Sequence, residues 1–337
     1  MNVIQYPYYG SKNPYQDLMS KALDSFDINT THISEFNKLI KRMTIGNEDI
    51  LHLHWIDGLL RINSLSKCFF YLIMLYCSLM IFRLRGKKII WTVHNLMNHE
   101  KQRKKLDLIH SKIVARLAHQ ILTHGEYAKK IVANKLNISE KKINVLYHGN
   151  YEDIIEPSPC KNRYFNINFL FFGMIRSYKG LPSLLDSFIE LKGDHQLQIV
   201  GIPKDIKLRK LLEEKSQFDP RIKLNLNYVD DRTLQKLLNW CDFVVLPYKE
   251  IFTSGSLLMA ISAGRPVIVP KIGVIPEYVN KDSAIFYNPE DKHGLTKALN
   301  EAIVCDDIQT MSQEALKQSK LFRWKAIAEQ LVKIYIQ

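Results

Sequence analysis

Short apolar runs alternate along the chain with longer amphipathic stretches. The runs expected to form strands in the first half are Val3–Tyr6, Ile50–Trp55, Lys88–His94, Gln120–Thr123 and Ile143–Tyr147. Those in the second half are Asn168–Phe172, Gln196–Val200, Ile222–Leu226, Phe243–Leu246, Val267–Val269 and Ala284–Tyr287. Helical spacing is clearest in Leu181–Leu191, Lys207–Lys215, Arg232–Trp240 and His293–Val304. Strands separated by helix-length segments are typical of parallel sheets covered on both faces, so the pattern predicts an α/β fold.

The alternation of strands and helices occurs twice, which indicates two domains. Between the two series lies Tyr151–Asn166, a polar stretch with two prolines that breaks the periodicity. A chain of 337 residues is also long for a single core. We therefore expect two Rossmann-like, doubly wound parallel-sheet domains facing a cleft, residues 1–155 and 156–318, and a C-terminal helix in 319–337 that packs back toward the first domain.

The charge balance limits the classes of partner that the protein is expected to bind. With 47 Lys and Arg against 34 Asp and Glu, the net charge is +13. Such a chain is suited to nucleic acid, an anionic membrane surface or a phosphorylated substrate. Its cations are spread along the chain and it has no aromatic-plus-basic RNA-binding signature, so nucleic acid is not an expected partner.

The sequence carries no signal for a bound metal or for export. The five cysteines form no CxxC pair, and there is neither a DxD at a strand end nor an HExxH. The first residues, MNVIQYPYYG, lack the pattern of a signal peptide. We expect a cytoplasmic protein with reduced thiols and no metal or other cofactor.

One apolar run, Cys68–Phe82, bears on membrane contact. Its 15 residues fall short of the roughly 20 needed to cross a bilayer, so we expect a buried helix of the first domain. The alternative is a helix in the membrane interface. The basic segment Lys101–Lys112 is either a solvated helix face or a patch drawn to anionic lipid.

The stretch FLFFGMIRSYKG, Phe169–Gly180, predicts an anion site. A buried strand ends at Gly173, and Arg176 and Lys179 follow just beyond it. A planar guanidinium grips two phosphate oxygens, an ammonium adds a point charge, and the amides of the next helix favour an anion. Further on, TSGS (Thr253–Ser256) opens a helix with residues that suit a helix cap or an anion nest.

Several motifs together resemble the family-four glycosyltransferases of the GT-B fold, which use nucleotide sugars in bacterial surface polysaccharide synthesis. The motifs are HLHW, WTVHNLMNHE, YHGNY, FFGMIRSYKG and TSGSLLMAISAGRPVIVP followed by GVIPE. The resemblance implies that the second domain binds a UDP- or GDP-sugar and the first an acceptor. The residues it places at the donor diphosphate are Gly173, Arg176, Lys179, Thr253, Ser254, Gly255 and Ser256, and those near the nucleotide are Gly201, Val229, Asp230, Glu250 and Glu277.

The chain departs from the family pattern at two places. Met174 replaces the arginine that usually follows the strand glycine, and Arg176 comes two residues later. Ile251 and Met259 replace the usual pair of glutamates, so Glu250 or Glu277 is left for the ribose, and the anomeric outcome stays open.

The first domain offers acceptor and catalytic candidates at its strand ends. A general base is needed if the transfer inverts the anomeric centre, and the candidates are Asp57, His94 and Glu100. On the acceptor side we expect Gly10, Asn13, His54 and His148.

The sequence thus predicts a metal-independent hexosyltransferase acting on a lipid-linked oligosaccharide at the inner face of the cytoplasmic membrane. The alternatives are an inverting GT-B transferase, a sugar-nucleotide epimerase, or a basic scaffold that binds a membrane or nucleic acid without chemistry.

Overall fold

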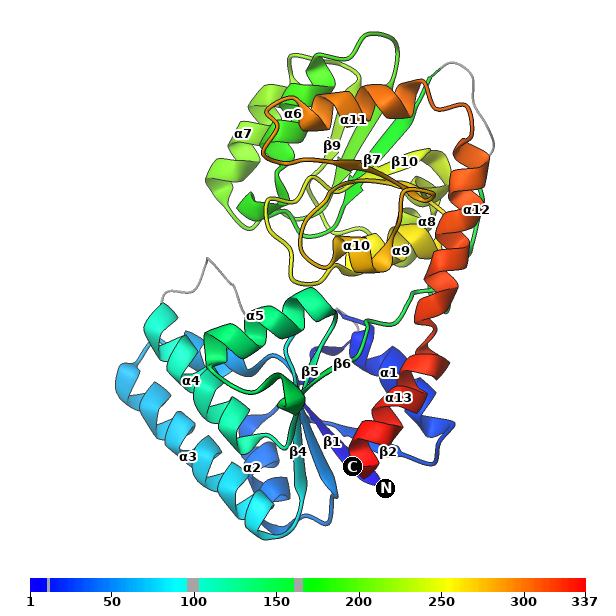
Figure 1. The fold of residues 1–337 in the computed structure, drawn as a ribbon. Helices are drawn as coiled ribbons and strands as arrows, with labels where there is room; N and C mark the ends of the chain where they lie inside the picture. Colours follow the sequence, from blue (N-terminus) through cyan, green and yellow to red (C-terminus); the bar gives the residue numbers. More distant parts are fainter. Residues whose placement is uncertain (11–12, 96–102, 161–165) are drawn as a thin grey trace. The chain divides into compact units, whose positions relative to one another are not determined.

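The computed structural model describes residues 1–10, 13–95, 103–160 and 166–337, and the chain forms two compact units (Figure 1). Unit 1 comprises Met1–Gly149 and Trp324–Gln337, and unit 2 comprises Asn150–Arg323. The chain thus leaves unit 1 a few residues before the predicted boundary. It returns for the C-terminal helix α13 (Trp324–Ile336), which packs on α1 (Tyr15–Asp24) within unit 1.

Unit 1 is built on a sheet of six parallel strands in the order β2-β1-β3-β4-β5-β6. The strands are β1 (Asn2–Tyr6), β2 (Asn29–His32), β3 (Ile50–Leu53), β4 (Lys88–Thr92), β5 (Gln120–Thr123) and β6 (Ile143–Val145). The connection from β1 to β2 crosses the sheet in the opposite direction to the connections that lead to the later strands. Because such crossovers are right-handed, its helix α1 lies on the opposite face of the sheet from the helices of those connections. Figure 1 shows α1 and α13 on one face and α2, α3 and α4 on the other.

The helices of unit 1 follow the strands in order. Besides α1 and α13 they are α2 (Phe36–Ile45), α3 (Leu65–Leu84), α4 (Lys104–Leu117) and α5 (Glu126–Leu136), with short 3₁₀ turns η2 (Ile56–Arg61) and η3 (Glu140–Lys142).

Unit 2 repeats the design with the order β12-β11-β10-β7-β8-β9, all parallel. The strands are β7 (Asn168–Phe172), β8 (Gln196–Val200), β9 (Ile222–Asn225), β10 (Phe243–Val245), β11 (Val267–Pro270) and β12 (Ala284–Tyr287). The helices are α6 (Leu181–Ile189), α7 (Ile206–Ser216), α8 (Asp231–Trp240), α9 (Gly255–Ser262), α10 (Ile275–Tyr278), α11 (Gly294–Ile303) and α12 (Ile308–Ser319), with the 3₁₀ turns η4 (Ser177–Lys179) and η5 (Lys320–Phe322). Every residue of β7 is buried, as a central strand covered on both faces requires.

The predicted α/β architecture and every predicted strand are confirmed, and one strand was missed. β2 reads NTTH, is only partly buried and lies at the sheet edge, so it lacks the apolar pattern that marks a strand. Its pairing with β1 is what makes it a strand.

The prediction of a short, buried helix at Cys68–Phe82 is wrong in two respects. The helix α3 spans 20 residues, because Ser64 caps its first turn by accepting from the amide of Lys67. It is also buried on one side only, since Cys68 and Leu79 are inaccessible whereas Phe70 and Ile73 are about 60% exposed.

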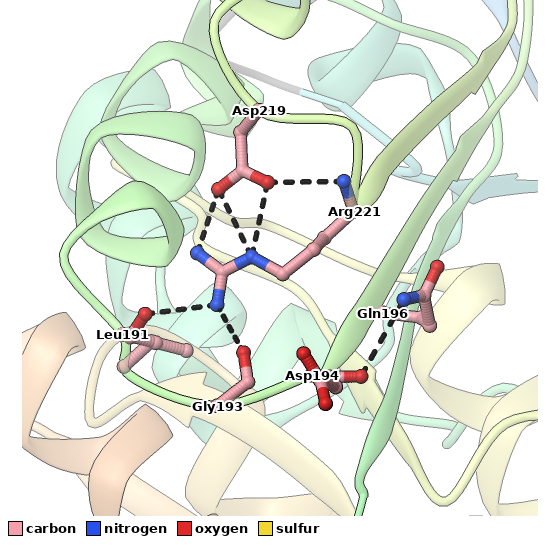
Figure 2. Close-up of polar contacts among 6 residues, drawn as sticks. All are labelled: Leu191, Gly193, Asp194, Gln196, Asp219 and Arg221. Atoms are coloured by element: carbon pink, nitrogen blue, oxygen red, sulfur yellow. Dashed lines mark hydrogen bonds and ion pairs between the residues drawn. The ribbon is translucent and has the colours of Figure 1, made fainter.

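The amino edge of the unit 2 sheet is held by a charged clamp (Figure 2). Arg221, just before β9, pairs with Asp219 (Nη2–Oδ2 2.6 Å) and donates from Nη1 to the carbonyls of Leu191 and Gly193 at 2.9 and 2.6 Å. The pKa of Asp219 is lowered, mainly by this hydrogen bond from Arg221. The clamp ties the loop before β8 to the loop before β9, on the edge opposite the candidate site.

We expect Arg221→Ala to lower the free energy of unfolding of unit 2 by about 2–3 kcal/mol, because it leaves a mostly buried carboxylate without its partner. Urea unfolding followed by circular dichroism measures the change. Lys223→Ala, at an exposed position of β9, is the matched control and should change stability by less than about 0.5 kcal/mol. Equal stability of the two variants would contradict the clamp.

Candidate functional site

The candidate donor site of unit 2 lies where its crossovers diverge. The connection after β7 runs toward β8, and the one after β10 runs toward β11, so the loops after these adjacent strands diverge at the carboxyl edge, where open α/β sheets bind ligands. The two loops are joined, because the amide of Lys249 donates to the carbonyl of Tyr178 at 2.8 Å. Gly180 lies so close to the carbonyl of Pro247 that no side chain would fit. The divergence point therefore brings together the two motifs that the sequence singled out.

Glycines allow the backbone to pass closely at this edge. Gly173 has φ +112°, and a Cβ there would lie 2.8 Å from Oγ of Ser256. Gly201, after β8, has φ +147° and faces the carbonyl of Gly173 at a distance that excludes any Cβ. Packing alone thus requires glycine at 201, next to the loop that was predicted to hold the diphosphate.

Lys179 is held by aromatic neighbours and points to the start of α9. Its Nζ donates to the hydroxyl of Tyr248 at 3.1 Å and lies 4.6 Å from the centre of that ring. The Tyr248 hydroxyl in turn lies 2.9 Å from Oγ of Ser254. A series of polar contacts therefore joins the Lys179 ammonium to the N-cap of α9. None of the described residues places a carboxylate against Nζ of Lys179.

The start of α9 has the features of an anion-binding helix end. Ser254 caps the helix by accepting from the amide of Leu257 at 3.1 Å. Ser256 donates to the carbonyl of Phe172 at 3.3 Å, which fixes α9 against the end of β7. The Oγ1 of Thr253 is buried and has no hydrogen-bond partner within the described part of the chain. Gly255 has no room for a side chain, because a Cβ would lie 2.8 Å from the hydroxyl of Tyr151. Free helix amides and an unused hydroxyl suit phosphate oxygens.

Arg176 lies on the same loop as Lys179 and is half-buried. Its Nε lies 3.3 Å from the sulfur of Met174, whose side chain is 49% exposed.

The five nucleotide candidates all follow strands at the same edge. Gly201 follows β8, Val229 and Asp230 follow β9, Glu250 follows β10, and Glu277 lies in α10 after β11. Asp230 also has a structural role, because its carboxylate caps α8 by accepting from the amide of Thr233 at 2.8 Å. Ile251 packs against Gly273, which brings the loops that carry Glu250 and Glu277 together.

Unit 1 gathers five buried histidines at the carboxyl edge of its sheet, the histidine cluster. His52 lies in β3, and the others follow successive strands, namely His54 after β3, His94 after β4, His124 after β5 and His148 after β6. None is more than 6% exposed. Tyr15 of α1 lies in edge contact with His94 at 4.8 Å, and the Trp55 ring stacks on His94 at 4.1 Å.

Burial keeps the cluster neutral at physiological pH. Desolvation lowers the pKa of His52 and His148 to about 3 and that of His124 to about 4. The pKa values of His54 and His94 are also well below 6.5, first because of burial and then because of their histidine neighbours.

Neutrality sets the direction of a hydrogen-bonded relay. The Leu146 carbonyl can only accept, so Nδ1 of His124 donates to it at 2.9 Å, and Nε2 of His124 accepts from Nδ1 of His94 at 3.1 Å. By the same rule, Nε2 of His94 accepts from Nδ1 of His54 at 3.1 Å. The relay ends on Nε2 of His54, a buried lone pair with no partner among the residues that the structure describes.

This arrangement bears on the three candidate bases. Both ring nitrogens of His94 are engaged, whereas His54 keeps an unused lone pair. The Asp57 carboxylate accepts from Arg61 at 2.8 Å. Glu100 lies outside the described residues.

Two acceptor-side candidates shape the loop after β1. Gly10 has φ +65°, and its carbonyl accepts from the amide of Asn13 at 3.1 Å. The Asn13 side chain accepts from the amide of Tyr15, so this turn leads into α1. His148 lies in the histidine cluster and donates from Nδ1 to the carbonyl of Gly149 at 2.7 Å.

Sequence reasoning missed three members of the unit 1 edge, namely Tyr15, His124 and Trp324. Trp324 begins the C-terminal helix and lies 5.2 Å from the ring of Tyr15. No local pattern joins residues so far apart in the chain. His124 carried a usable signal, because it directly follows a predicted strand.

Among the described residues, no three His, Cys, Asp or Glu side chains are grouped so that they could hold a metal ion. In the candidate donor site, Lys179 and Arg176 supply positive charge, and the α9 amides add the partial positive charge of a helix N-terminus.

Two six-stranded parallel sheets with helices on both faces define the GT-B fold of glycosyltransferases, and solved structures share it. A UDP-glucose complex of HepE from Anabaena superposes with a TM-score of 0.76 at 14% identity, covering 99% of this chain and 98% of that one. Sucrose-phosphate synthase from Thermosynechococcus elongatus superposes with a TM-score of 0.74 at 14% identity, covering 100% and 98%. At identities this low, the superpositions establish the fold alone.

The match to a family model lies within unit 2. Residues 166–304 match the family model described as glycosyl transferases group 1. A GDP-mannose:glycolipid 4-beta-D-mannosyltransferase from Xanthomonas campestris is 30% identical over 236 residues, which cover 68% of this chain. The match spans 64% of that relative's length, slightly less than two thirds.

We expect stability to fall on mild acidification because of the histidine cluster. In the unfolded chain these imidazoles take up protons near pH 6.5, whereas in the fold they stay neutral well below that. Their contribution is complete above pH 7 and is lost as the pH falls from 6.5 toward 4, by about 1.4 kcal/mol per pH unit for each histidine. Urea unfolding at pH 7.5, 6.5 and 5.5, followed by tryptophan fluorescence, measures the slope. A stability that is flat over this range would contradict the buried, neutral cluster.

Proposed function

We propose that the protein is a hexosyltransferase that moves a sugar from a UDP- or GDP-sugar to a lipid-linked saccharide in the synthesis of a capsule, O-antigen or exopolysaccharide. The observation that carries the proposal is the junction of Lys179, the Gly173 turn and the capped start of α9 at the divergence point of unit 2. The group 1 match of the same segment supports a glycosyl donor.

The site supplies what cleavage of a sugar–phosphate bond requires. The diphosphate leaving group gains negative charge as the bond breaks, and donors held in advance stabilise that charge. Lys179 is oriented by Tyr248, Ser254 holds the α9 amides in place, and Thr253 offers an unused hydroxyl. With these cations and amides the transfer proceeds without a metal ion.

The acceptor and the cellular location of the enzyme are inferred from a relative and not from the site. The relative from Xanthomonas campestris is named for a glycolipid acceptor and for GDP-mannose, which favours a lipid-linked acceptor and makes GDP-mannose the first donor to test. A lipid-linked acceptor requires the enzyme to work at the inner face of the cytoplasmic membrane as a peripheral protein. If the transfer inverts, the candidate bases are those predicted at the strand ends of unit 1, namely Asp57, His94 and Glu100.

We expect Lys179→Ala to weaken binding of the preferred nucleoside diphosphate by about 10- to 100-fold, because a charge-assisted contact to phosphate is lost. Arg176→Ala should weaken it as well, because a guanidinium that can contact the diphosphate is lost. Isothermal titration with UDP, GDP, UDP-glucose and GDP-mannose measures both changes. Lys210→Ala, at an exposed position of α7, is the matched control. Unchanged affinity in Lys179→Ala, with circular dichroism intact, would refute the donor site.

We expect transfer to a lipid extract to continue in excess EDTA at a rate within about twofold of the untreated enzyme. Radiolabelled GDP-mannose and UDP-glucose, chased into the organic phase, report the transfer. Donor consumption without an organic-phase product would favour the epimerase, and binding without consumption would favour the scaffold. Loss of transfer in EDTA that returns with Mg²⁺ would overturn the metal-independent mechanism.

A further inference from the structure

The helix α3 presents a continuous apolar stripe to solvent. Its members recur at helical spacing and face one way, and we call them the α3 stripe: Phe69, Phe70, Ile73, Cys77, Met80, Ile81 and Leu84. The large side chains among them are 41–85% exposed. Among the described residues α3 is also the one helix that is long and apolar enough to cross a membrane, judged by length and composition alone.

The opposite side of α3 belongs to the core of unit 1. Cys68, Leu72 and Leu79 are at most 2% exposed, and Leu60 and Leu106 of neighbouring segments pack in this region. α3 also contacts α2, α4 and β4. A helix that crossed a bilayer would have to leave these contacts, so the fold holds α3 on the surface of the unit.

The surroundings of the stripe are positively charged. The helix contains no acidic residue, and Lys67 and Arg83 lie exposed near its two ends. The adjacent helix α4, on the same face of the sheet (Figure 1), adds Lys104 and Lys105 at exposed positions. An apolar band with cations around it matches the acyl boundary and headgroups of an anionic bilayer.

We propose that unit 1 docks on anionic phospholipid through the α3 stripe, with α3 parallel to the membrane plane and its apolar side chains in the acyl boundary. This docking surface would account for the peripheral membrane association in the proposed function. The proposal rests on that function, because a lipid-linked acceptor is the reason for contact with a membrane. A second copy of the chain is a poorer occupant, since a symmetric contact would bring two rims of like charge together.

Cys77 provides a probe at the centre of the stripe. It is exposed, Cys68, Cys160 and Cys241 are buried, and Cys305 is half-exposed. Labelling a Cys305→Ser variant with an environment-sensitive fluorophore therefore reports on the stripe. We expect a blue shift with vesicles of phosphatidylcholine and 30% phosphatidylglycerol, and at least tenfold weaker binding to phosphatidylcholine alone.

The stripe variant Phe70→Ser/Ile73→Ser/Ile81→Ser changes exposed positions only, so it should fold. We expect it to lose vesicle binding at least tenfold in co-sedimentation and to keep the affinity for the nucleoside diphosphate. The matched control, Phe218→Ser/Tyr228→Ser, removes exposed aromatics of unit 2 and should bind vesicles as the wild type does.

The outcomes separate this proposal from the proposed function. Vesicle binding that the stripe variant retains, or no vesicle binding by the wild type, would overturn the docking surface while leaving donor binding untouched. A concentration-dependent dimer that the variant loses, with no vesicle binding, would assign the stripe to a second copy. Loss of nucleoside diphosphate binding in Lys179→Ala with vesicle binding intact would support both proposals independently.

Discussion

The constraint on which the rest of the structure depends is the common edge of a parallel sheet. All strands of such a sheet end on one side, and where neighbouring crossovers turn to opposite faces no helix covers that edge. In unit 2 this point lies between β7 and β10, and the loops there carry Lys179 and the start of α9. The opposite edge is closed by Arg221. The candidate donor site and the Arg221 clamp thus lie at opposite ends of the same strands.

The carboxyl edges of the two sheets differ in the charge of their side chains. Unit 2 keeps cations and helix amides accessible, which suits an anion that arrives and leaves. Unit 1 buries five neutral histidines against aromatic rings and uses their tautomers to order a relay toward His54. A buried imidazole costs little when it is neutral and hydrogen-bonded, so the cluster is a stable element at neutral pH and a weakness in acid.

Most of the fold could be predicted because its strands are buried on both faces and read as apolar runs. β7, FLFF after Asn168, is such a strand, whereas β2 is not, since its partners lie in β1 and its own residues are polar. The candidate donor motif could be read from the sequence because Gly173, Arg176 and Lys179 are neighbours in the chain, and its role stays a prediction. The relay could not, because His54, His94 and His124 come from three strands and their hydrogen bonds depend on the register between them.

The sequence by itself determined two parallel sheets, a glycine turn with two cations, and a helix opened by small hydroxyl residues, because each is written in contiguous residues. Only the tertiary structure decided which imidazole keeps a free lone pair, that Gly201 is required by the carbonyl of Gly173, and that α3 turns one apolar side outward. The physical reason is the same in each case: hydrogen bonding, steric exclusion and burial depend on neighbours that the order of residues does not specify.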